Sequence, residues 1–503
     1  MNSELDSSGR NTPDKKDFES LPTAPTKVED VENAGLSRTV DAETEKKLMR
    51  KIDIRIIPML CWIYLMNFMD RVNIGNGRLY GLERDLGMVG NDYQLAVSVL
   101  FITYCLFETP SNMIIKKMQP ARYLSGLLLC WGMVATFSAF VQTKGALIAC
   151  RLLLGMFEAG LFPGVILYLS MFYNKRHVSL RNAVFYGTSA ISGALGGLVA
   201  YAIGELDGTA GWSGWRWIIL INGIPTILTA PVALFVLPNS PETASFLNDE
   251  DRHNMVLLRE AEVGQTTRGQ KLLKEDVIAG AKDWKTWAMC VGMFAGLGML
   301  YSFSVFLPTI ISNMSGDWSN QTVQALTIPV YFMGFAVYVF GAWYSDRLQQ
   351  RGIFVISGFC VCILGYIFLI ANANVGLSFA GCFVVAMGLW TATGAAMTWI
   401  NVNNPRYGKR AFSSGMQITI GNSAGVAAPF LYSAGDAPEY YPGYSATIGL
   451  LIMAVCIYTM LHFWYKKQNA RKLAGKEDWR MEGKTEEEIN EMGEFNPRFM
   501  YTI

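Results

Sequence analysis

The sequence predicts an all-α membrane protein that crosses the bilayer twelve times, as two bundles of six helices. Three observations lead to this fold class. Hydrophobic residues make up 51% of the chain, charged residues only 17%, and the mean hydropathy is +0.24. The apolar residues form runs of about 20, the length that a helix needs to span a membrane. A polar stretch in the middle of the chain separates the first six runs from the last six.

The expected spans set the domain boundaries. We predict spans at 54–76, 93–115, 121–141, 145–170, 181–204, 215–237, 286–312, 323–345, 353–371, 376–400, 412–433 and 444–465. They define an N-terminal bundle (51–237) and a C-terminal bundle (285–465), joined by a linker (238–284). Residues 1–50 are polar and nearly free of aromatic residues, which is typical of a disordered tail. Residues 466–503 form a C-terminal tail.

Positive charge in the short loops predicts the orientation, because cytoplasmic loops are enriched in Lys and Arg. All five clusters fall on one side of the membrane: Lys116/Lys117/Arg122, Lys175/Arg176/Arg181, Arg347/Arg351, Arg406/Lys409/Arg410 and Lys466/Lys467/Arg471. Both termini are therefore expected in the cytoplasm. The opposite side carries two candidate glycosylation sequons, at Asn313 and Asn320.

Several function classes are disfavoured by composition. The net charge of +1 argues against a nucleic-acid partner. The nine cysteines lie inside apolar runs without metal-like spacing, so we predict no metal. The sequence shows no nucleophile paired with a base and no phosphate-binding loop, which argues against an enzyme, and we predict no cofactor.

Two charged residues in the fourth expected span indicate transport. Arg151 and Glu158 are seven residues apart, close to two helical turns, and therefore share one helix face. On insertion scales each buried charge costs about 2.5–3.5 kcal/mol at the centre of a membrane helix, and such residues usually mark a pathway for substrate or protons.

The arrangement of spans and one loop resemble the major facilitator superfamily. The segment Gly341-Ala-Trp-Tyr-Ser-Asp346-Arg347 is similar to a loop signature of that superfamily, in which an Asp or Arg pins neighbouring helix ends. The resemblance assigns Asp346 and Arg347 to a gate or to helix packing. The equivalent loop of the first half, 112–122, lacks the acidic residue.

Further motifs resemble the anion:cation symporter family, especially its fungal allantoate and nicotinate permease branch. They are Asp70-Arg71-Val-Asn73-Ile-Gly75-Asn76, Arg151…Gly155…Glu158…Pro163, Phe306-Leu-Pro-Thr-Ile-Ile311, Asn403-Asn-Pro-Arg-Tyr407, Gly421-Asn422, Asp436-Ala-Pro-Glu-Tyr440 and Asn496-Pro-Arg-Phe499. The resemblance implies proton-coupled uptake of small carboxylates across the plasma membrane. We expect a single chain to be the transport unit.

Arg71 is the leading candidate for the substrate ligand. A guanidinium offers a planar fork to a carboxylate, and the resemblance places the anion site in the motif that also holds Asn73. The alternative is an arginine that reaches toward the outer surface or fixes a loop. Tyr301 and Trp390 offer aromatic faces to a flat substrate, although each residue is also explained by core packing.

Glu158 is the leading proton carrier, with Arg151 as its expected partner. Desolvation favours a neutral carboxyl and a nearby cation favours the charged form, so rearrangement of the pair would switch the affinity for a proton. The alternative is a permanent salt bridge that fixes the helices. Asp70 would orient Arg71 or close an outer gate, and Glu108 would pack helices or close an inner gate.

Span seven contains no Arg or Lys inside the membrane, so a single cation clamp favours a monocarboxylate. The resulting prediction is a proton symporter for nicotinate or for an allantoate-, pantothenate- or biotin-type acid. Two alternatives stay open: an exporter of an acidic metabolite, and a sensor that binds the same ligand. The short tails, 1–50 and 466–503, contain no recognisable signalling module, which disfavours the sensor.

Overall fold

The computed structural model describes residues 40–115, 118–173, 175–263, 273–315, 317–437 and 439–503. Lys116, Lys117 and most of the predicted N-terminal tail lie outside the described residues. The α-helices of the described chain are α2 (Ala42–Leu79), α3 (Leu82–Asp85), α4 (Asp92–Ile115), α5 (Pro120–Phe137), α6 (Lys144–Glu158), α7 (Leu161–Phe172), α8 (Lys175–Ile203), α9 (Gly214–Val236), α10 (Asp249–Val263), α11 (Lys274–Lys282), α12 (Trp284–Ser312), α13 (Asn320–Leu348), α14 (Gly352–Ala371), α15 (Val375–Val402), α16 (Tyr407–Ala427), α17 (Tyr441–Leu473) and α18 (Glu486–Glu491).

The predicted all-helical fold is confirmed. Ten helical segments among the described residues are long and apolar enough to cross a membrane. The other two expected spans correspond to α4, of 24 residues, and α16, of 21 residues. The low hydropathy of α16 has a physical reason: Ser413, Gln417 and Asn422 are buried against other helices and do not face lipid.

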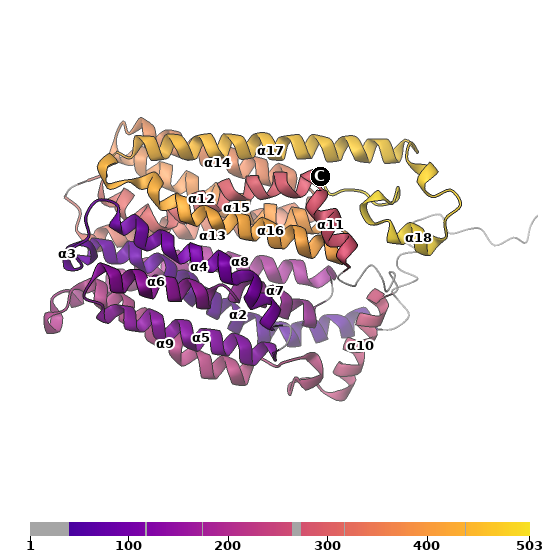
Figure 1. The fold of residues 1–503 in the computed structure, drawn as a ribbon, viewed down its shortest axis with the longest axis horizontal. Helices are drawn as coiled ribbons and strands as arrows, with labels where there is room; N and C mark the ends of the chain where they lie inside the picture. The colour runs from indigo at the N-terminus through magenta and orange to yellow at the C-terminus, as the bar shows by residue number, and fades with distance from the viewer. Residues whose placement is uncertain (1–39, 116–117, 174, 264–272, 316, 438) are drawn as a thin grey trace, which may run out of the picture.

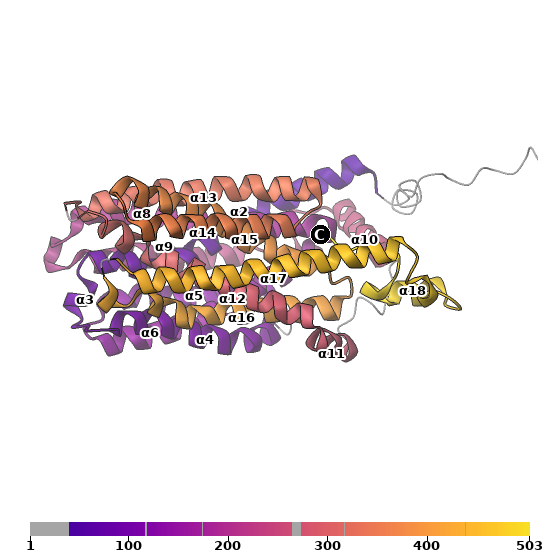
Figure 2. The ribbon, with the colours of Figure 1, turned by 90° about the horizontal axis from the view of Figure 1, so that it is seen from above.

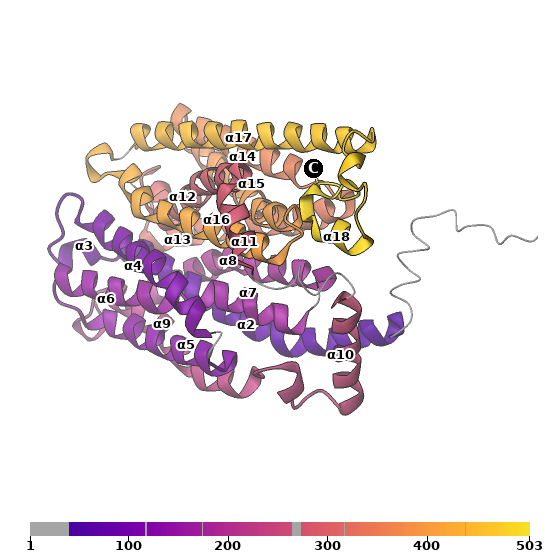
Figure 3. The same ribbon diagram turned by 45° about the vertical axis from the view of Figure 1, so that its right-hand side comes forward.

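The long helices run side by side along the longest axis of the molecule (Figure 1). Helices α2 to α9 form one group and α12 to α17 the other, as the separate colours in Figure 3 show. Viewed from above, α17 lies in front (Figure 2), and it packs on α14 and α12. The two groups meet where α8 packs on α13, α4 on α16 and α2 on α12. We call the end that carries α10, α11 and α18 the inner end, following the predicted orientation.

Local sequence explains where several helices begin. A side-chain oxygen at the N-cap accepts a hydrogen bond from a backbone N–H of the first turn, at Asp41, Thr143, Asp283, Ser319 and Asn374. The first long helix starts well before the span expected at 54–76. Helix α2 begins at Ala42, because the Asp41 cap starts it within the segment expected to be a disordered tail.

The fourth expected span is divided into α6 and α7. The division falls at Ala159 and Gly160, immediately after the buried Glu158. Gly160 lies close to two side chains, since a Cβ added there would be 2.0 Å from Ser111 Oγ and 3.1 Å from the Tyr123 hydroxyl. The small residue therefore lets α4 and α5 approach the turn that carries Glu158.

The inner ends of α13 and α14 are joined by an ion pair between Asp346 and Arg351. Arg351 Nη1 also donates to Ser345 Oγ at 3.4 Å. The Arg347 guanidinium lies 5.7 Å from the Trp343 ring centroid. The loop signature thus contributes Asp346 to the contact between helix ends, and its cationic partner is Arg351.

The two groups of helices are bound together at their outer ends. Asn320 Nδ2 donates to the Leu79 carbonyl at 2.8 Å, and Gln94 Nε2 donates to the Tyr432 carbonyl at 2.9 Å. Between these ends α2 and α12 approach closely, because a Cβ added at Gly75 would lie 2.2 Å from the Val305 carbonyl oxygen. Only a glycine at position 75 allows this backbone contact.

Substitution of Gly75 by Ala tests this contact. The added methyl group must push α2 and α12 apart, and overpacking of this kind costs about 1–3 kcal/mol. We expect a lower melting temperature of the purified protein. Gly126→Ala in α5 is the matched control, since nothing lies within 4 Å of a Cβ added there. Equal melting temperatures for the two variants would contradict the close contact.

Candidate functional site

A buried ion pair joins α2 to α6. Arg71 Nε lies 2.6 Å from Glu158 Oε2, and Glu158 is fully buried, with 0% of its surface exposed. The guanidinium also lies 4.5 Å from the ring centroid of Tyr104 on α4. The second carboxylate oxygen, Glu158 Oε1, is buried without a hydrogen-bond partner. The ion pair therefore engages one carboxylate oxygen of Glu158 and leaves the other outside it.

The structure does not form the expected ion pair between Arg151 and Glu158. Seven residues of α-helix separate the two positions by about 10 Å along the axis, so a shared face does not bring the charged groups into contact. Arg151 is 6% exposed, and its Nη1 donates instead to the backbone carbonyl of Asp70 at 3.5 Å. Glu158 pairs instead with Arg71 of α2, so the predicted substrate ligand and the predicted proton carrier are in direct contact.

Asp70 points away from the ion pair, into the N-terminal bundle. Its Oδ2 accepts hydrogen bonds from Trp131 Nε1 at 2.9 Å and from Thr226 Oγ1 at 3.4 Å. Trp131 on α5 is fully buried. Among the described residues the Asp70 carboxylate has no ion pair with Arg71. Sequence reasoning missed Trp131 and Thr226 because each looks like an ordinary core residue of an apolar span.

The space beside Arg71 is closed. A cavity of about 10 Å³ is lined by residues of α2, α4, α6 and α12, among them Arg71, Phe101, Arg151 and Tyr301. This volume is enough for about one water molecule. The Tyr301 hydroxyl donates to Asn422 Oδ1 at 2.6 Å. The structure thus places Tyr301 beside the cavity that Arg71 lines and leaves no room for an organic molecule.

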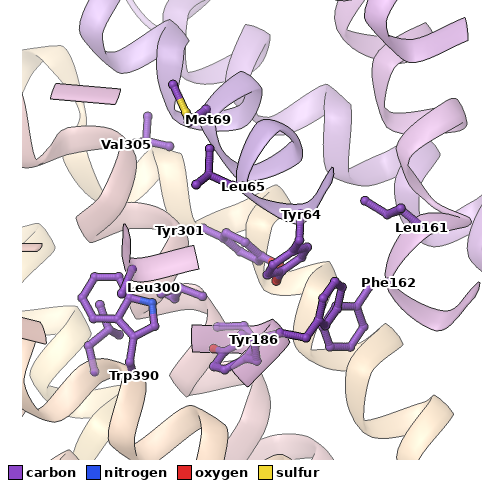
Figure 4. Close-up of a cluster of buried hydrophobic side chains, with 14 of the residues drawn as sticks. Tyr64, Leu65, Met69, Leu161, Phe162, Tyr186, Leu300, Tyr301, Val305 and Trp390 are labelled. Carbon is purple, nitrogen blue, oxygen red and sulfur yellow. The ribbon is translucent and has the colours of Figure 1, made fainter. Parts of the chain in front are cut away.

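Aromatic side chains from both groups of helices lie close together in the buried cluster of Figure 4. The Tyr64 ring centroid lies 4.4 Å from that of Phe185 and 5.8 Å from that of Phe162. Figure 4 also shows Tyr301 beside Tyr64, with Trp390 farther away. The three N-terminal aromatics lie on α2, α7 and α8, and the sequence alone gave no sign that they meet.

Two other predicted substrate residues do not line the cavity beside Arg71. Trp390 Nε1 donates to Ser189 Oγ at 3.1 Å, which links α15 to α8. Asn73 is 2% exposed, and its Oδ1 is buried without a hydrogen-bond partner. Asn73 therefore carries an unsatisfied acceptor, whereas Trp390 is engaged in packing between the two groups of helices.

Glu108 lies in the contact between the two groups of helices. It is 3% exposed, and its Oε2 accepts a hydrogen bond from Thr419 Oγ1 of α16 at 3.1 Å. Cys105 Sγ, one turn away on α4, donates to the Thr419 carbonyl at 3.7 Å. The hydrogen bond of this carboxyl group can form only while α4 and α16 are close together.

The two sequon asparagines lie near the outer ends. Asn313 Nδ2 donates to the Tyr440 hydroxyl at 3.5 Å, and Asn320 Nδ2 donates to the Leu79 carbonyl. Glycosylation of Asn320 would compete with that hydrogen bond. Over the described part of the chain, no three His, Cys, Asp or Glu side chains are grouped as a metal site.

Comparison with known proteins gives the family. The profile of the Major Facilitator Superfamily matches residues 60–429. An uncharacterized transporter of Schizosaccharomyces pombe is 35% identical over 88% of this chain and 87% of its own length. A high-affinity nicotinic acid transporter of Saccharomyces cerevisiae is 30% identical over 86% of this chain and 80% of its own length.

Solved structures agree on the fold. A bacterial homologue of the human lysosomal transporter Spinster, in an inward-facing and unoccupied conformation, superposes with a TM-score of 0.62 at 16% identity. The match covers 80% of this chain and 95% of that one.

The observed pairing predicts a specific pattern of stability. Arg71→Met or Glu158→Gln leaves one buried charge without its partner, which costs about 3–5 kcal/mol, and the double variant should be less destabilised than the sum. Arg151→Met and Glu158→Gln should be more nearly additive. Melting temperatures of the purified variants measure both cycles. Stronger coupling of Glu158 to Arg151 than to Arg71 would contradict the structure.

Proposed function

The chain belongs to the major facilitator superfamily, and on that premise we propose that it imports a small organic monocarboxylate together with a proton, with nicotinate the favoured substrate. The ion pair between Arg71 and Glu158 is the observation that carries the proposal. In this account Arg71 binds the substrate carboxylate, and Glu158 is the carboxylate that holds the same site when substrate is absent.

The first step is an exchange of carboxylates on one guanidinium. Arg71 is surrounded by side chains of α2, α4, α6 and α12, so a new anion cannot gain a full set of hydrogen bonds unless Glu158 leaves. A planar guanidinium binds a carboxylate through two parallel N–H donors, whereas Glu158 now takes a hydrogen bond from Nε. A substrate that approaches with both oxygens therefore competes well with Glu158.

Proton coupling follows from charge balance. Glu158 is fully buried, and an unpaired carboxylate in such surroundings is costly, so its release from Arg71 favours uptake of a proton. The neutral state before binding is the Arg71–Glu158 pair. The neutral state after binding is Arg71 with the substrate anion and a protonated Glu158. One proton thus accompanies one monocarboxylate, and a dicarboxylate would leave a charge uncompensated.

The surroundings of the pair favour an acid with a flat ring. Tyr301 lines the cavity beside Arg71, Tyr64 lies beside Tyr301 (Figure 4), and the Phe185 ring packs against Tyr64 at a tilt. Aromatic faces bind flat rings through offset or edge-to-face contacts. The relative in Saccharomyces cerevisiae whose name gives nicotinic acid as its substrate supports the same choice. Among the described residues of α12 beyond Lys285 there is no second cation.

Substrate entry requires the two groups of helices to separate, because the cavity beside Arg71 holds about one water molecule. Alternating access by rocking of two bundles about a central site accounts for this requirement. The Glu108–Thr419 hydrogen bond and the Gly75–Val305 contact would then break and form as the groups rock.

The direct test is uptake in a fungal host that lacks its own nicotinate transport. Labelled nicotinate is supplied at two external pH values, with unlabelled carboxylates as competitors and a protonophore as control. We expect uptake to rise at acid pH and to collapse with the protonophore. Absence of uptake from cells that display the protein at the surface would overturn nicotinate import, and efflux from preloaded cells would then test export.

Glu158→Gln separates binding from coupling. Glutamine cannot carry the proton, so the variant should exchange labelled for unlabelled substrate across the membrane yet lose accumulation against a gradient by tenfold or more, an order-of-magnitude expectation from loss of the coupling group. Glu250→Gln, on an exposed position of α10, is the matched control. Accumulation by the Glu158 variant at the normal level would place proton coupling elsewhere.

A further inference from the structure

The C-terminal segment returns to the inner end of the helices and docks there. Figure 1 shows the chain leaving α17, passing through α18 and ending beside the inner ends of the second group of helices. We call residues 493–503 the tail segment. Its contacts involve five helices, α12, α14, α15, α16 and α17, and most of them reach its backbone.

Lys472 of α17 holds the first part of the tail segment. Its Nζ donates to three backbone carbonyls, those of Glu494 at 2.7 Å, Asn496 at 3.1 Å and Phe499 at 2.8 Å. Lys472 is 5% exposed. The ammonium group therefore spends all three of its donors on one stretch of peptide backbone.

Two side-chain amides form paired hydrogen bonds with the backbone of the last residues, as one β-strand does with another. Asn469 exchanges two hydrogen bonds with the backbone of Tyr501, at 2.8 and 2.9 Å. Asn403 does the same with Thr502, at 3.0 and 2.8 Å. Each amide offers a donor and an acceptor to one residue, as a neighbouring β-strand does.

Two further donors complete this backbone contact. Trp399 Nε1 donates to the Thr502 carbonyl at 2.8 Å, and the Arg351 N–H donates to the Ile503 carbonyl at 2.7 Å. These residues belong to α15 and to the start of α14. The segment therefore connects helix ends that are far apart in sequence.

Two side chains of the tail segment are buried in specific surroundings. The Tyr501 ring is 6% exposed and lies 4.8 Å from the Tyr465 ring centroid. Glu494 is 5% exposed and forms ion pairs with Lys285 of α12 at 3.2 Å and Lys409 of α16 at 2.6 Å. Removal of Glu494 would leave these two lysines with Asp283 as their remaining ion-pair partner among the described residues.

Two sequence motifs that the proposed transport site does not use meet at this place. Asn496-Pro-Arg-Phe499 forms a turn, closed by a hydrogen bond from the Phe499 N–H to the Asn496 carbonyl at 3.0 Å, and this turn aims its carbonyls at Lys472. Asn403-Asn-Pro-Arg-Tyr407 supplies Asn403 and Arg406. Arg406 forms an ion pair with Asp276 of α11 at 2.6 Å and donates to the Glu491 carbonyl.

We propose that the inner end of the second group of helices is a peptide-binding groove that holds residues 493–503 in cis, and that the docked segment fastens five helix ends into one body. Recognition rests on backbone hydrogen bonds from Lys472, Asn469 and Asn403, with Tyr501 and Glu494 as the side chains that select this segment. The Arg406 contacts extend the fastening to α11 of the linker. Rocking of the bundle as a unit requires its inner ends to stay together.

Truncation after Met492 tests the groove, with the peptide returned in trans. We expect the truncated protein to melt about 3 °C lower or more, and a synthetic peptide of residues 493–503 to restore the melting temperature in a saturable manner. A scrambled peptide of the same composition is the control. An unchanged melting temperature, or equal effects of both peptides, would overturn the proposal.

Full-length variants decide the question if the truncated chain does not fold. Lys472→Met and Tyr501→Ala should each lower the melting temperature, and Met500→Ala, at a position 39% exposed, should not. Amide hydrogen exchange measures whether the tail segment holds the helix ends together. In the Tyr501 variant, protection should be lost together at the inner ends of α12, α14, α15, α16 and α17. Unchanged protection there would contradict the fastening. These measurements involve no substrate, so their outcome does not depend on the proposed transport function.

Discussion

A charge buried among apolar helices is stable only while it keeps a partner, and this constraint governs the centre of the molecule. Glu158 is enclosed without exposed surface, and Arg71 supplies its partner from the neighbouring helix. If an anion binds Arg71 and displaces Glu158, the buried Glu158 carboxylate must therefore be neutralised. The same constraint that fixes α2 against α6 thus gives the proposed transporter its linkage between substrate and proton.

The rest of the structure supports this pair or limits access to it. On the far side of α2, Trp131 and Thr226 donate hydrogen bonds to the Asp70 carboxylate. These bonds keep the carboxylate away from Arg71. Contacts between the two groups of helices close the site, through Gly75 and Val305 on one pair of helices and Glu108 and Thr419 on another. At the inner end the tail segment adds a different kind of contact, which holds helix ends of one group together.

Hydropathy and charge predict the helical spans well, because apolar length is a property of each segment alone. They also identify Arg71 and Glu158 as buried charges. The pairing of these two residues depends on the rotation and height of α2 relative to α6. Neither quantity can be predicted from a single sequence. Spacing along one helix therefore suggested Arg151, whose position is about 10 Å from that of Glu158 along the helix axis.

Other features escaped prediction for related reasons. Trp131, Tyr64 and Phe185 are apolar residues in apolar spans, so nothing in their sequence context separates a site residue from a core residue. The docking of the tail segment depends on Lys472 and on amides of helices distant in sequence. A polar C-terminal stretch gives no sign of such partners. The domain boundaries and the roles of the individual site residues stay predictions until transport is measured.

Proton exchange on substrate binding tests the central claim most directly. Purified protein in a weakly buffered detergent solution, with a pH indicator, is mixed with nicotinate or with the best competitor found in the uptake assay. Displacement of Glu158 from Arg71 predicts uptake of about one proton per ligand bound, seen as an alkaline shift, and none in Glu158→Gln. Ligand binding without proton uptake in the natural protein, or equal uptake in the variant, would contradict the account.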